Sequence, residues 1–156
     1  MPAFDTTRRV AYSRTEMFDL VADVEAYPQF LPLCEGLRVL SRERTGDIEV
    51  IVAAMDVGYK AIRETFTSRV TLDRAALTVV ADLVEGPFRQ MQNRWNFVAV
   101  EGGCDVRFHI AYEFKSMMLQ LLVGAMFDQA FRKFTEAFEL RAKAVYGPRA
   151  VTGSTV

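Results

Sequence analysis

Residues 105–146, which read DVRFHIAYEFKSMMLQLLVGAMFDQAFRKFTEAFELRAKAVY, decide the fold of this chain. Over Val106–Lys115, large apolar residues alternate with polar or small ones. A period of two is typical of a β-strand that turns one face to the core and the other to solvent. His109, the single histidine of the chain, falls on the polar face, so we expect it at the surface. The stretch therefore opens with a half-buried strand.

The same stretch continues as a helix. Ser116 can cap it and Gly147-Pro148 ends it, so the predicted helix covers about Met117 to Val145. One apolar stripe follows the helix at intervals of four, three and four residues, and it consists of Phe127, Phe131, Phe134 and Phe138. An apolar stripe of this length needs a surface to cover, and a sheet can supply one.

Upstream of the helix, short polar or glycine-containing breaks separate apolar stretches. Two of these breaks are Thr45–Asp47 and Asp56–Gly58. Short breaks between long strands indicate antiparallel hairpins. A first strand falls within residues 3–11, and the others are predicted at Leu37–Arg44, Ile48–Met55, Tyr59–Leu72, Ala75–Glu85, Phe88–Val100 and Asp105–Lys115.

A shorter helix follows the first strand. Ser13 and Glu16 form a capping box, and the apolar residues after it recur with helical spacing. This helix should end before Pro28, because the residue before a proline is pushed out of the α conformation. We expect a short helical turn between Pro28 and Leu31 that closes one end of the core.

These elements predict an α+β fold in which a curved antiparallel sheet of six to seven strands wraps around a long C-terminal helix. Residues 1–146 should form one domain, because 156 residues fit a single core. The last ten residues, 147–156, are rich in turn formers, and we expect a mobile tail.

Composition and charge exclude several classes of protein. The net charge of −1 argues against the basic footprint of a DNA-binding protein. Two cysteines and one histidine are too few for a structural zinc site, so no metal is expected. The first residues lack the apolar core of a secretory signal, which favours the cytoplasm and free thiols at Cys34 and Cys104.

No arrangement of catalytic side chains follows from the sequence, so we expect no enzyme activity and no cofactor. A polar residue on an apolar strand face is a stronger candidate for binding. Asn93 shares its face with Met91, Trp95 and Phe97. Because an unpartnered polar group is unfavourable when buried, Asn93 needs either an internal partner or the polar head of a ligand.

A second polar pair falls on an apolar face of the strand that begins at Tyr59. Lys60 and Glu64 share parity with Ile62 and Phe66. They can pair with each other, lie at an exposed edge of the sheet, or contact a ligand.

The window Met117–Phe127 is apolar around most of its circumference, yet it is too short to span a bilayer. It can pack under the sheet. The alternative is that its outer side contacts a membrane surface or a protein partner.

Several motifs resemble those of one family. They are DVEAYPQFLPLC at residues 23–34, VGYK at 57–60, ETFTSRV at 64–70, and GPF at 86–88 followed by WNF at 95–97. Together they resemble the coenzyme-Q-binding START-domain group. This group includes a ribosome-association toxin branch and is related to polyketide cyclases. The likeness covers about residues 3–146.

The resemblance implies a helix-grip fold of the START/Bet v 1 type with a deep apolar tunnel between the sheet and the long helix. It implies ubiquinone or a polyprenyl precursor as ligand, bound without catalysis in support of respiratory electron transfer. The resemblance places the pocket at Phe30, Leu31, Pro32, Tyr59, Lys60, Phe66, Trp95 and Phe97. To these we add Asn93 from its strand face, and Phe127 and Phe131 from the helix stripe.

Three hypotheses follow. The first is a lipid-quinone carrier in the cytoplasm, with peripheral contact to the inner membrane through Met117–Phe127 and a cavity of several hundred Å³. The second is a ribosome-associated regulator, which needs an unpaired basic patch formed by Arg38, Arg42, Arg44, Arg63 and Arg69. The third is an aromatase/cyclase-like enzyme, which needs an acid or base such as Glu64 inside the cavity.

Overall fold

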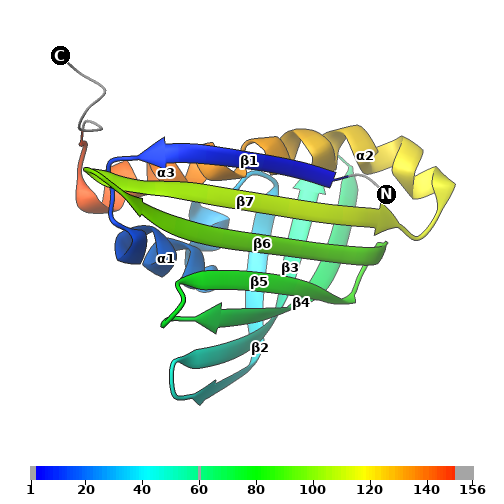
Figure 1. Ribbon diagram of the computed structural model, residues 1–156. Helices are drawn as coiled ribbons and strands as arrows, with labels where there is room; N and C mark the ends of the chain where they lie inside the picture. Colours follow the sequence, from blue (N-terminus) through cyan, green and yellow to red (C-terminus); the bar gives the residue numbers. More distant parts are fainter. Residues whose placement is uncertain (1–2, 60, 150–156) are drawn as a thin grey trace.

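The computed structural model describes residues 3–59 and 61–149, and its seven strands form one fully antiparallel sheet. The order across the sheet is β1 (Ala3–Val10), β7 (Gly103–Phe114), β6 (Phe88–Val100), β5 (Thr78–Glu85), β4 (Ile62–Asp73), β3 (Ile48–Tyr59) and β2 (Cys34–Thr45). The helices are α1 (Arg14–Ala22), a 3₁₀ helix (Val24–Gln29), α2 (Met117–Arg132) and α3 (Phe134–Tyr146). Figure 1 shows that the sheet is strongly curved and that α2 and α3 run along it. The predicted α+β fold is confirmed.

The curvature of the sheet has a local cause. The strand register shifts at Cys34/Gly36 and Val39/Ser41 in β2, and again at Thr67/Ser68 in β4 and Phe88/Gln90 in β6. Bulges of this kind bend a strand and increase its twist. Four of them in one sheet allow it to close around the helices.

The alternation predicted for β6 and β7 is present. Trp95 lies opposite Phe108 and Phe97 lies opposite Val106, and all four side chains are buried. His109 lies on the outer face, where its Nδ1 is 2.6 Å from Oδ1 of Asp5 on β1. The two faces of the sheet therefore differ in polarity, as the sequence predicted.

The C-terminal helix is interrupted, whereas the sequence predicted one helix from Met117 to Val145. At Lys133 the backbone N–H donates to the carbonyl of Ala130, three residues back, at 3.0 Å. This tighter turn replaces the four-residue spacing of an α-helix and separates α2 from α3. The phenylalanine stripe continues across the break, because Phe131 and Phe134 contact each other with ring centroids 5.4 Å apart.

The predicted turn at Asp56–Gly58 is wrong, because β3 continues through it to Tyr59. A glycine is needed at position 58 because the side chain of Glu35 lies close to its backbone, and not because the chain turns there. A Cβ on Gly58 would lie 2.4 Å from the side chain of Glu35 on the neighbouring strand β2. The next strand, β4, begins at Ile62.

The first helix has the predicted capping box. Ser13 Oγ accepts from the backbone N–H of Glu16 at 3.1 Å, and Glu16 Oε1 accepts from the N–H of Ser13 at 2.9 Å. The helical turn expected from Pro28 onwards begins earlier, since the 3₁₀ helix covers Val24–Gln29 and contains Pro28 near its end.

The chain is anchored after α3. Gly147 offers its carbonyl to the hydroxyl of Tyr12 at 2.6 Å, and Arg149 contacts both carboxylate oxygens of Glu16 at 2.7 and 3.0 Å. Gly147 and Arg149, which belong to the predicted mobile tail 147–156, therefore contact the domain. Residues 150–156 of that tail lie outside the described residues.

Candidate ligand-binding cavity

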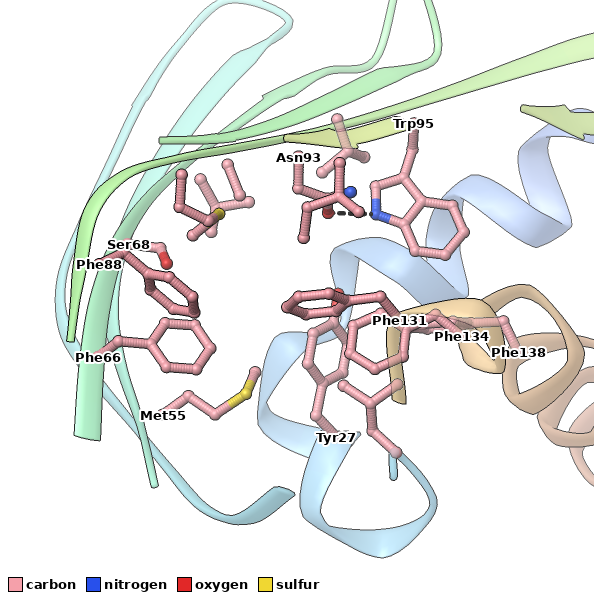
Figure 2. A pocket seen from close by; sticks show the side chains of 16 residues that line it. Tyr27, Met55, Phe66, Ser68, Phe88, Asn93, Trp95, Phe131, Phe134 and Phe138 are labelled. Carbon is pink, nitrogen blue, oxygen red and sulfur yellow. Dashed lines mark hydrogen bonds between the residues drawn. The ribbon is translucent and has the colours of Figure 1, made fainter. Parts of the chain in front are cut away.

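A cavity of about 80 Å³ lies between the concave face of the sheet and the helices. The sheet contributes side chains from β3 to β7, and the other side is formed by Tyr27, Leu31 and three phenylalanines of α2 and α3. Figure 2 shows Phe66, Phe88 and Met55 facing Phe131, with Trp95 at the far end. Apolar side chains thus supply most of the lining.

Asn93 is the polar side chain that the strand pattern placed on this face. Its Nδ2 donates to the carbonyl of His109 at 2.9 Å, and its Oδ1 accepts from Nε1 of Trp95 at 2.8 Å. The amide therefore has internal partners that fix the orientation of the indole (Figure 2). One N–H of the amide remains available to a ligand oxygen.

Ser68 adds a hydroxyl to the cavity. It lies on β4 between Phe66 and Val70, and its side chain faces the same space (Figure 2). Among the described residues, no hydrogen-bond partner is found for its Oγ. Because a serine hydroxyl can donate or accept, Ser68 is suited to a carbonyl or ether oxygen of a ligand.

Tyr27 completes the polar groups of the cavity. Its hydroxyl donates to the backbone carbonyl of Val21. Burial raises the pKa of Tyr27 above its ordinary value, so the phenol stays neutral. Of the described residues that line the cavity, none carries a formal charge at neutral pH.

A larger cleft lies outside the cavity. It has a volume of about 450 Å³ and separates α2 from Pro32, Leu33 and Ile62. The helix side of the cleft includes Leu122 and Ala130. Leu31, which precedes Pro32, and Phe131, which follows Ala130, line the inner cavity. The cavity and the cleft are therefore lined by neighbouring residues of the same two segments.

The inner cavity is smaller than the several hundred Å³ expected from the sequence. Phenylalanine packing explains the difference. Rings of Phe131, Phe134 and Phe138 occupy the space under the sheet, with Phe138 5.0 Å from Trp95 between ring centroids. The outer cleft has a volume of that scale.

The predicted site residues fall into three groups. Leu31, Phe66, Asn93, Trp95 and Phe131 line the inner cavity.

Four others lie elsewhere. Pro32 lines the outer cleft, and Phe30 lines a separate groove against α3. Phe97 is buried behind Trp95, against which it stacks at 6.3 Å between centroids. Phe127 packs against Phe88 in the core, so it does not reach the cavity.

The last two are Tyr59, the final residue of β3, and Lys60. Lys60 lies outside the described residues, and the side chain of Tyr59 is likewise not described. Glu64 is half-buried on β4 but does not line the cavity. The predicted Lys60–Glu64 pair therefore stays a prediction.

Sequence reasoning missed Ser68 and Tyr27. Ser68 shares parity with Phe66 and Val70, so strand alternation could have placed it inside. Tyr27 lies in the DVEAYPQFLPLC motif, but a 3₁₀ helix gives no alternation from which its direction could be read.

The cysteines do not belong to the cavity. Both are free thiols, as predicted, and both are buried. Burial raises the pKa of Cys34 to about 11 and that of Cys104 to about 12, so both remain protonated. In residues 3–59 and 61–149 no three His, Cys, Asp or Glu side chains are placed to hold a metal ion.

The arginine patch required by the ribosome hypothesis is largely neutralised. Arg69 is exposed on β4. The other four arginines pair with carboxylates: Arg38 with Asp56, Arg42 with Glu25 and Glu49, Arg44 with Glu49, and Arg63 with Glu35. The expected unpaired basic patch is therefore not found at these residues.

Residues 10–139 match the family described as polyketide cyclase / dehydrase and lipid transport. The match covers most of the chain, and it agrees with the sheet, helices and cavity described above.

The chain belongs to this family.

Two relatives in the family differ in the role that their names give. The ribosome association toxin RatA of Escherichia coli (strain K12) is 37% identical over 150 residues, which are 96% of this chain and 92% of the relative. The coenzyme Q-binding protein COQ10 homolog B, mitochondrial, of Xenopus laevis is 28% identical over 153 residues, which are 95% of this chain and 61% of the relative.

Solved structures agree on the fold. The 18 kDa protein CC1736 from Caulobacter crescentus is 33% identical, with a TM-score of 0.77 over 95% of this chain and all of that one. A START superfamily protein from Mycobacterium smegmatis is 22% identical, with a TM-score of 0.76 over 92% and 98%. The Zhui aromatase/cyclase from Streptomyces sp. R1128 is 18% identical, with a TM-score of 0.78 over 97% and 98%. The last two show the START-like fold alone.

Proposed function

We propose that this protein binds an uncharged, mostly apolar small molecule in the inner cavity and catalyses no reaction on it. The proposed ligand is ubiquinone or a related polyprenyl lipid, with its oxygenated ring beside Ser68 and Asn93. The relative named as a coenzyme Q-binding protein supports this ligand class.

One observation carries the proposal, namely that every polar group in the described part of the lining is neutral. Ser68, Asn93 and Tyr27 supply hydroxyl and amide groups, and the other lining residues are apolar. A carboxylate or phosphate in this cavity would be buried without a counter-charge, which is strongly unfavourable. A quinone ring instead offers neutral carbonyl oxygens that Ser68 and Asn93 can contact as donors.

The size of the cavity divides the ligand into two parts. A volume of about 80 Å³ is smaller than the roughly 150 Å³ cavity that holds benzene in another protein, so the phenylalanines under the sheet must shift to admit a quinone ring, and a polyprenyl chain does not fit. The tail would extend into the outer cleft, between α2 and the loop at Pro32 and Leu33. Burial of apolar groups there stabilises the complex by about 0.8 kcal/mol per methylene.

The same lining favours binding over catalysis. Aromatisation and cyclisation need a general acid or base within hydrogen-bond reach of the substrate. Among the residues that the structure describes, those around the cavity include no carboxylate, imidazole or amine. We therefore propose a carrier or a ligand-dependent regulator.

Ribosome binding is a second candidate, and the name of the relative at 37% identity favours it. The two proposals concern different parts of the molecule, since a ribosome would contact the surface and a lipid the interior. The paired arginines of β2 to β4 weaken one surface for this role. Co-sedimentation with ribosomal subunits across a salt series tests it, because phosphate contacts weaken steeply as salt rises.

Titration of a short-tailed ubiquinone tests the first proposal. Trp95 is the single tryptophan of the chain and lines the cavity, so its fluorescence reports occupancy. We expect saturable quenching by the quinone, and we expect that excess palmitate, whose chain ends in a carboxylate, does not reverse it. Absence of quenching by the quinone, or its reversal by palmitate, would contradict the proposal.

A further inference from the structure

We propose that the exposed start of α2 docks on a phospholipid bilayer and brings the outer cleft to the lipid surface. The docking surface, called the α2 patch below, consists of Met117, Met118, Leu121 and Leu122. Its purpose rests on the proposed function, because a membrane is where a polyprenyl ligand would be taken up or released.

The side chains of the α2 patch are large and apolar, yet they are mostly exposed. The exposed fractions are 75% for Met117, 70% for Met118, 79% for Leu121 and 64% for Leu122. The opposite side of the same helix is buried through Val123 and Phe127. Figure 1 shows this part of α2 at one end of the molecule, where it can approach a flat surface. Large apolar side chains gathered in this way mark a contact surface.

The patch is continuous with the outer cleft. Leu122 belongs to both, and Ala125 and Met126 extend the apolar wall of the cleft along the next turn of the helix. A lipid tail that leaves the cleft therefore emerges beside the patch. This continuity distinguishes the α2 patch from the isolated exposed leucine at position 40 on β2.

Size and charge favour a bilayer over a second copy of the chain. A stable dimer buries roughly 800 Å² on each partner, which is more than four side chains on one helix can supply. Residues 114–127 contain no acidic side chain, and their single charge is the exposed Lys115 at the start of the patch. The next carboxylate, Asp128, is paired with Arg132 at 3.0 Å. Apolar side chains beside a basic residue are typical of segments that insert at an anionic lipid surface.

Flotation of the full chain with vesicles of phosphatidylcholine and phosphatidylglycerol tests this proposal. We expect wild type to float, and Leu121→Glu to reduce the bound fraction about tenfold, because it places a carboxylate at the lipid surface. Leu40→Glu makes the same change at an exposed leucine on β2 and should float as wild type does. Leu121 does not line the cavity or the cleft, so quenching of Trp95 by the quinone in detergent should stay unchanged.

Several results would overturn the proposal. These are absence of wild type from the vesicle fraction, flotation of Leu121→Glu at the wild-type level, or equal losses for both variants. A dimer that Leu121→Glu dissociates would also overturn it, since the occupant would then be a second copy. Failed flotation with intact quinone binding rejects the membrane contact alone. Flotation that depends on Leu121 without quinone binding rejects the ligand proposal alone.

Discussion

The chemistry of the cavity depends on the hydrogen bonds that two polar side chains make within the protein. Asn93 makes hydrogen bonds to Trp95 and to the backbone of β7, so it is held in place before any ligand arrives. Ser68 has no such bond to the described residues and keeps its hydroxyl available. We therefore expect Asn93 to orient the cavity wall and Ser68 to recognise an oxygen of the ligand.

Replacing Ser68 with alanine tests this recognition. The variant loses one neutral hydrogen bond to a ring oxygen, which corresponds to about 1 kcal/mol, or about fivefold in affinity. Quenching of Trp95 by a short-tailed ubiquinone measures the loss. Thr67→Val is the matched control, because Thr67 lies on β4 next to Ser68 but does not line the cavity. If Ser68→Ala and Thr67→Val bind as wild type does, Ser68 has no part in recognition.

For single residues, the sequence predicted correctly which strand side chains face the interior, because strand alternation determines this. Strand parity placed Asn93 inside with Trp95, and the structure shows both in the cavity lining. Phe97 shares that parity, yet it lies behind the indole, because parity gives the face of a strand and not the position along it. The prediction from the helix stripe that Phe127 lines the cavity is wrong for the same reason. Phe127 lies on the predicted face of the helix but one turn away from the cavity.

At the scale of elements, α1 and the segment after α3 hold each other. Arg149 contacts the Glu16 carboxylate and lies 4.9 Å from the ring of Tyr12, and the hydroxyl of Tyr146 donates to the carbonyl of Glu16 at 3.2 Å. The Arg149 hydrogen bond holds the pKa of Glu16 below its ordinary value of 4.5. The ion pair therefore contributes stability above that value, and the contribution is lost as the pH falls through the lowered pKa.

Thermal unfolding of Arg149→Ala tests this contact. We expect a lower melting temperature than wild type near about pH 7, by a small amount because the pair is partly exposed. The difference should disappear in acid, once Glu16 is protonated in both proteins. In a Glu16→Gln background, which keeps the capping box, Arg149→Ala should show no such pH dependence. A difference that persists unchanged in acid would contradict the ion pair.

Local sequence patterns predicted most helices and strands, but they missed features that depend on contacts between distant residues. Capping and periodicity predicted both helical regions and the strand series. They did not predict the break at Lys133, which has no proline or glycine to signal it and which lies between two rings packed under the sheet. They misread Gly58 as a turn, because the need for a glycine arises from Glu35, which is 23 positions earlier in the chain.

At the scale of the whole molecule, the cavity, the outer cleft and the α2 patch lie in series. The polar groups that the described residues bring to the cavity are neutral. The cleft has the larger volume, and it shares Leu122 with the patch. None of these features follows from the fold alone, since proteins with this fold include a toxin, a coenzyme Q-binding protein and an aromatase/cyclase.

Mass spectrometry of an organic extract tests the central claim most directly, with the protein purified from its own host. We predict one neutral quinone or polyprenyl molecule per chain in wild type. Ala81→Leu, which fills the cavity from β5, should remove it, and Ala111→Leu, which lies on β7 outside the cavity, should retain it. An extract without such a molecule from wild type, or equal amounts from Ala81→Leu and wild type, would contradict a ligand in this cavity.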